Sequence, residues 1–166
     1  MTASRALLTG LLVITAAVLQ TVVLVRLPLP YGRPDLVLVL VAAIAMAAGS
    51  GVGMSVGFAA GLVCDLLADH PAGMLALVLC LVGYACGLVP DARDRGVLLP
   101  LGVVVIAAAA AALAFAVLLA IVGSPRLDWH VVGASLPACA AYDVILAAFV
   151  VPLANVMYRR LDARAR

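Results

Sequence analysis

Long apolar runs, separated by short gaps that hold nearly all of the charges, are the feature that most constrains this chain. A helix that spans a bilayer needs about 20 predominantly apolar residues. Hydrophobic residues make up 67% of the sequence, whereas ordinary soluble domains are roughly 45–50% apolar. A soluble core of this size could not bury so much apolar surface, so we expect lipid to be the solvent for most of it. The sequence therefore predicts an all-α integral membrane protein.

About six transmembrane helices are expected, because the run from 34 to 68 is too long for a single span. The Gly49-Ser50-Gly51 cluster offers a break within it. We expect Pro34 in the first turn of the second helix, with Asp35 beside it at the positive end of the helix dipole. That short helix either is tilted little, is partly re-entrant or lies buried among its neighbours. The predicted single domain is 1–166, with helices at about 6–25, 34–48, 52–68, 72–89, 97–122 and 131–158.

The arginine distribution supports six spans, and it also predicts the orientation. Six spans put both termini on one side of the membrane, and we expect that side to be cytoplasmic because basic residues favour it. With six spans only Arg26, Arg33 and Arg126 lie outside, and the arginines expected inside are Arg5, Arg93, Arg95, Arg159, Arg160, Arg164 and Arg166. Five spans would instead move the loop or tail arginines to the outer side.

Glycines recur every four residues through the predicted third helix, and Asp65 completes the series that holds Gly53, Gly57 and Gly61. Small residues at this spacing let two helices approach backbone to backbone. Two interpretations remain open. The glycine row either packs against another helix of the same chain or forms a docking groove for the helix of a partner protein.

Two acids lie within apolar runs, where charged groups are rare and usually have a role. Asp65 lies near the end of its helix, so it is either a solvated acid or a structural or partner-binding one. Asp143 lies deeper in the last helix and should face protein or pair with a polar group. Gln20 and Thr21 on the first helix are plausible polar neighbours for it.

The sequence carries no phosphate-binding loop, no Ser/His/Asp series and no zinc-binding HExxH motif. The four cysteines lie in apolar runs without a CxxC pair, which is typical of buried thiols. A net charge of +2 is too small to indicate nucleic-acid binding. We therefore expect no enzymatic activity, no metal and no cofactor.

Several motifs resemble those of the bacterial rod shape-determining protein MreD family. They are Gln20 late in the first helix, Pro34-Asp35-Leu36, the Gly57-Phe58-Ala59-Ala60-Gly61-Leu62-Val63-Cys64-Asp65-Leu66 segment followed by Gly73, and an apolar helix over Leu75–Gly83 that ends in Tyr84. The resemblance is loose over the whole chain and specific mainly over 34–84.

The resemblance implies a non-catalytic scaffold of cell-wall elongation in the bacterial cytoplasmic membrane. Its implied partner is MreC, a single-pass protein, and its indirect partners are RodA, a class B penicillin-binding transpeptidase and MreB. The implied fold is similar to the substrate-binding subunit of energy-coupling-factor transporters. The residues expected to pack helices or bind the partner are Pro34, Asp35, Gly53, Gly57, Gly61, Asp65 and Gly73, with Gln20 and Asp143 as intramembrane polar groups.

A substrate-binding subunit of a vitamin-type transporter is the alternative function. Such a site needs a cavity with several convergent polar groups. The short set of polar residues in the apolar runs argues against it: Gln20, Thr21, Ser55, Asp65, Tyr84, Tyr142, Asp143 and Asn155.

Overall fold

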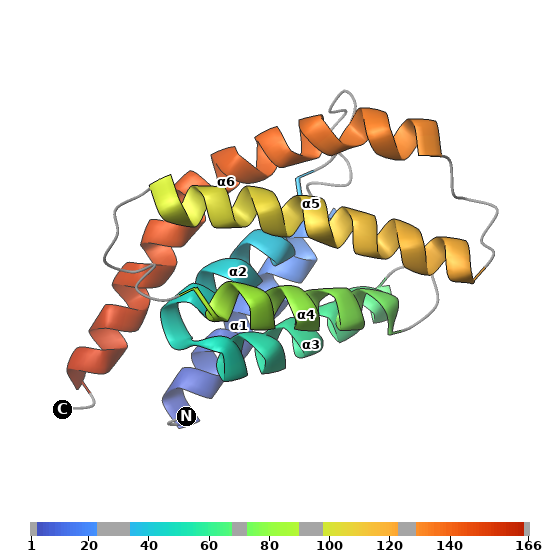
Figure 1. Cartoon of the computed structure of the whole chain (residues 1–166). Helices are drawn as coiled ribbons and strands as arrows, with labels where there is room; N and C mark the ends of the chain where they lie inside the picture. Colours follow the sequence, from blue (N-terminus) through green and yellow to red (C-terminus); the bar gives the residue numbers. More distant parts are fainter. Residues whose placement is uncertain (1–2, 23–33, 68–72, 90–97, 123–128, 165–166) are drawn as a thin grey trace.

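The computed structural model describes residues 3–22, 34–67, 73–89, 98–122 and 129–164. Within these ranges it contains six α-helices and no strands (Figure 1), so the all-α class is confirmed. The helices are α1 (Ala3–Val22), α2 (Leu36–Ala48), α3 (Ser50–Leu67), α4 (Met74–Gly87), α5 (Leu98–Ile121) and α6 (Trp129–Arg164).

The predicted break between the second and third helices lies at Gly49. This residue ends α2 with φ of 93°, a backbone conformation that favours glycine, and α3 begins at the next residue. At the other end of α2 the prediction was wrong by two residues. Pro34 lies before the helix, and Asp35 is its N-cap.

The last helix is longer than the sequence predicts. It begins at Trp129, a residue placed in a loop by the sequence, and it continues beyond Tyr158 to Arg164. Pro137 and Pro152 lie inside α6. Each proline removes one backbone N–H donor and crowds the preceding turn, which favours bending. Figure 1 shows α6 bending along its length. The other predicted loops, at 27–33, 69–71 and 90–96, lie outside the described residues.

Helix α2 is the centre of the fold. It packs against each of the other five helices, and nearly all of its side chains are buried. Its sequence explains this position, because it carries apolar residues on every face, and a helix of that kind is stable only when surrounded by apolar material. At 13 residues it is about 20 Å long, which is shorter than the hydrocarbon core of roughly 30 Å.

Helices α3 and α4 form the closest pair, and the glycine row lies between them. A Cβ added at Gly53 would overlap the Gly83 carbonyl oxygen, and one added at Gly57 would overlap that of Leu79. At Gly61 it would overlap the Ala76 backbone. These pairings run in opposite directions along the two helices, so the pair is antiparallel. We call this contact the glycine seam.

Among the residues that the structure describes, three helices are long and apolar enough to cross a membrane: Ser50–Leu67, Leu98–Ile121 and the Pro137–Tyr158 part of α6. The outer faces carry large apolar side chains, among them Ile106 and Phe149, which are 72% and 74% exposed. Such exposure suits lipid and not water. The described parts of α1, α2 and α4 are shorter apolar helices.

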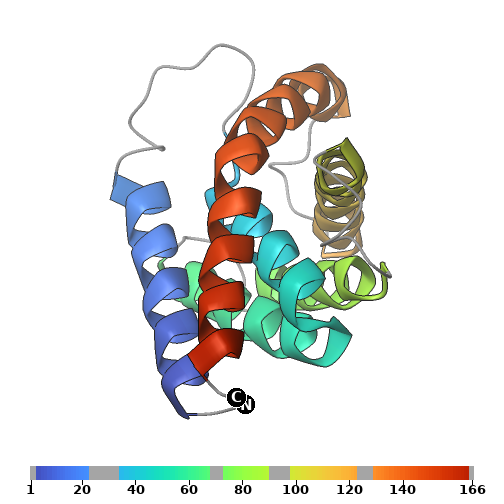
Figure 2. The same cartoon turned by 90° about the vertical axis from the view of Figure 1, so that its left-hand side faces the viewer.

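The beginning of α1 and the end of α6 are joined by a buried hydrogen bond of 2.8 Å between the Thr9 and Tyr158 hydroxyls. Figure 2 shows these two helix ends at the same end of the molecule.

Substitution within the glycine seam should destabilise the protein. We expect Gly57→Ala to lower the free energy of unfolding by about 1–3 kcal/mol, because the added methyl group meets the α4 backbone. Gly51→Ala is the matched control on the same helix, since a Cβ there meets nothing within 4 Å. Thermal unfolding of the detergent-purified variants measures both. Equal melting temperatures for the two variants would show that the seam is less tight than described.

Candidate functional site

Asp65 holds the start of α4. Its carboxylate is 3% exposed and accepts hydrogen bonds from the backbone N–H groups of Gly73, Leu75 and Ala76, at 2.8, 3.2 and 3.1 Å. Gly73 is the N-cap residue, and its φ of 98° explains why glycine is suited to this position. Asp65 is therefore a structural acid that joins the last turn of α3 to the first turn of α4.

Three side chains hold the start of α2. Asp35 caps its own helix by accepting a 3.0 Å hydrogen bond from the Leu38 N–H. Gln20 from α1 accepts one of 2.9 Å from the Val37 N–H. Asp143 from α6 accepts one of 2.7 Å from the Asp35 N–H. We call Gln20, Asp35 and Asp143 the α2 cap.

Elementary electrostatics explains why acids occupy these positions. The first N–H groups of a helix have no partner within the helix, and the helix dipole makes that end positive. In a lipid-surrounded protein no water is at hand to satisfy them, so side chains must supply the acceptors. Helices α2 and α4 both begin inside the protein, and each has a buried carboxylate from another helix at its start.

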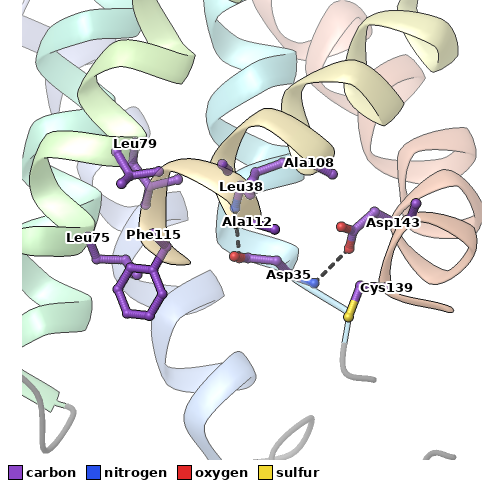
Figure 3. A pocket seen from close by; sticks show the side chains of 12 residues that line it. Asp35, Leu38, Leu75, Leu79, Ala108, Ala112, Phe115, Cys139 and Asp143 are labelled. Carbon is purple, nitrogen blue, oxygen red and sulfur yellow. Dashed lines mark hydrogen bonds between the residues drawn. The ribbon is translucent and has the colours of Figure 1, made fainter. Parts of the chain in front are cut away.

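A cavity of about 280 Å³ adjoins the α2 cap, between α2, α4, α5 and α6. Figure 3 shows Asp143 on one side of it, the apolar groups Leu75, Leu79 and Phe115 on the other, and Asp35 between them. Alanines of α5 and Cys139 of α6 complete the wall.

The chemistry available here is that of binding and helix fixation. In the part of the chain that the structure describes, no group of three or more His, Cys, Asp or Glu side chains could hold a metal ion. The cysteines are not paired with one another. Nothing among these residues forms a nucleophile and base pair of the kind that covalent catalysis needs.

The residues predicted as a site are divided between three places. Gly53, Gly57 and Gly61 lie in the glycine seam, Asp65 and Gly73 join α3 to α4, and the α2 cap gathers the remaining polar groups. Pro34 is buried next to the α2 cap. Because α4 already packs against the α3 glycines of the seam, internal packing is favoured over a docking groove for a partner helix. Partner binding at any of these residues stays a prediction.

Sequence reasoning missed two glycines of α4. A Cβ at Gly83 would overlap the Gly53 backbone, and one at Gly87 would overlap the Ser50 backbone. Their spacing of four residues is the same signal that revealed the glycines of α3. The Thr9–Tyr158 hydrogen bond was also missed, and no sequence pattern predicts it.

A protein-family model described as rod shape-determining protein MreD matches residues 2–161. No curated protein and no solved structure matches the chain. The similarity to the energy-coupling-factor subunit fold therefore stays a prediction.

Removing the Asp65 carboxylate should loosen the α3–α4 connection. We expect Asp65→Ala to lower the free energy of unfolding by about 2 kcal/mol or more, since three backbone N–H groups lose their acceptor. Asp65→Asn keeps one acceptor oxygen and should lie between Ala and wild type. Thermal unfolding in detergent measures the stabilities of the two variants and the wild type. An alanine variant as stable as wild type would mean that water satisfies the start of α4.

Proposed function

Because the chain belongs to the MreD family of rod shape-determining proteins, we propose that it is a non-catalytic membrane scaffold of the bacterial cell-wall elongation complex. In this role it binds MreC and, through that partner, is coupled to RodA, to a class B penicillin-binding transpeptidase and to MreB. The observation that carries the proposal is the family match over residues 2–161, nearly the whole chain.

The disposition of the polar groups supports a structural role. Asp35, Asp65, Asp143 and Gln20 all accept hydrogen bonds from the first N–H groups of a helix. These side chains fix helices in place, which is what a scaffold requires. The outer helix faces remain apolar and exposed, and partner helices in membranes associate through such faces by close packing.

We further propose that the chain crosses the cytoplasmic membrane several times, with both termini in the cytoplasm. The hydrogen bond between Thr9 and Tyr158 supports a common side for the two ends, since it joins the start of α1 to the end of α6. The arginine distribution supports the cytoplasm as that side.

Reporter fusions test the orientation. Green fluorescent protein fused after Arg166 should fluoresce, and alkaline phosphatase fused there should be inactive, because the phosphatase matures only outside the cytoplasm. A phosphatase fusion after Arg126 is the matched control and should be active, since the arginine distribution places that residue outside. Active phosphatase at the C-terminus would contradict the proposed orientation.

Affinity purification of the full-length tagged chain from crosslinked membranes tests the scaffold role. We expect mass spectrometry to identify MreC together with RodA and the transpeptidase. An unrelated multi-pass protein with the same tag controls for nonspecific capture. Recovery of a pair of ATPases without MreC would overturn the proposal and support the transporter alternative.

Single cysteines at exposed positions can then map the contact. We expect crosslinks to MreC to concentrate on one outer face among Ile14 (α1), Phe58 (α3), Leu81 (α4), Ile106 (α5) and Phe149 (α6). Because the glycine seam is filled by α4, Gly57 should give none.

A further inference from the structure

The cavity beside the α2 cap has the composition of a ligand site. Its volume of about 280 Å³ is close to the lower limit of ligand pockets, which is roughly 300 Å³. Its wall is almost entirely apolar, apart from the two acids Asp35 and Asp143 (Figure 3). A few polar groups in an apolar cavity fix the orientation of a ligand, while the apolar wall supplies most of the contact area.

One carboxylate oxygen in this cavity is unsatisfied. The Asp143 side chain is 2% exposed, and its Oδ1 accepts the hydrogen bond from the Asp35 N–H. Across the described ranges, its Oδ2 has no hydrogen-bond partner. An unpaired carboxylate oxygen away from water is strongly unfavourable unless a donor or a cation reaches it.

The charge around the cavity specifies the kind of donor. The Asp143 carboxylate contacts the backbone N–H of Asp35, and no lining residue is basic. Two acids without a basic side chain give the cavity an excess of negative charge, which favours a cation inside it. A neutral or anionic ligand would leave that excess in place.

We propose that this cavity binds a small organic ammonium ion. The ammonium group donates a hydrogen bond to Asp143 Oδ2 and lies against Asp35, and its apolar body packs against Leu75, Leu79 and Phe115. The inference does not rest on the scaffold function, because it depends only on the residues that line the cavity.

A metal ion fits the cavity less well than an ammonium ion. Magnesium and calcium need about six or more oxygen ligands, whereas the lining residues offer two carboxylates that already bind backbone N–H groups. A basic side chain from a partner helix would match the charge. The position of the cavity among four helices of this chain favours a small molecule instead.

Binding of tritiated 2-phenylethylamine to the purified full-length chain in lipid nanodiscs tests the proposal. We expect saturable binding above that of empty nanodiscs. Unlabelled 2-phenylethylamine should compete, whereas the neutral 2-phenylethanol and the anionic 3-phenylpropionate should not. Equal competition by 2-phenylethanol would show that the cavity takes up apolar molecules without regard to charge, which contradicts the proposal.

Two asparagine variants remove the charge and keep the helix cap. In Asp143→Asn the amide oxygen can still accept from the Asp35 N–H, and asparagine is also a good N-cap in Asp35→Asn. We expect each to weaken amine binding by at least about tenfold, because a buried charge pair is lost. Melting temperatures close to that of wild type confirm that the variants fold. Unchanged affinity in both would overturn the proposal.

A second pair of variants tests the cavity itself without touching the acids. Ala112→Leu fills the cavity and should abolish binding, whereas Ala120→Leu, at an exposed position of the same helix outside this cavity, should not change it. If wild type binds no amine and folded Asp143→Asn loses a protein partner, the small-molecule proposal fails, and the acids bind a basic side chain of that partner.

Discussion

The need of buried helix ends for hydrogen-bond acceptors determines much of this structure. Helices α2 and α4 are too short to reach water at both ends of a bilayer, so their first N–H groups must find partners inside the protein. Gln20, Asp35, Asp65 and Asp143 supply them. These four side chains come from α1, the N-cap of α2, α3 and α6, and each bond except that of Asp35 also joins two different helices. Satisfying the backbone and assembling the bundle are thus one process.

Close packing of small residues is the second interaction that holds the helices together. Lipid offers little hydrophobic drive for helices to associate, so close packing must supply the attraction. Glycines on both α3 and α4 bring the two backbones into contact, and Asp65 fixes the register at the end of that contact. Helix α2 then lies in the middle, with its small and branched side chains facing every neighbour.

The sequence was most informative where a local rule applies. Apolar runs predicted the helical class, a glycine cluster predicted the end of α2 at Gly49, and the spacing of four predicted close packing by Gly57. It was least informative about contacts between distant segments. No local sequence pattern predicts the contact of Asp143 with the N–H of Asp35, because that contact depends on how all the helices pack together. The end of α6 was misplaced because the sequence analysis assigned the basic residues after Tyr158 to a tail, whereas the helix continues through them to Arg164.

The bond between Asp143 and Asp35 also has a consequence for biogenesis. The two residues are 108 positions apart, and the Thr9–Tyr158 pair is 149 apart. A ribosome makes α2 long before it makes the helix that completes its cap, because chains are synthesised and fold from the N-terminus. The Asp35 N–H therefore lacks its Asp143 acceptor until the last helix arrives, whereas Gln20 and Asp35 can hold the rest of the α2 start before then. Completion of this cap is a late event in the translation of the protein.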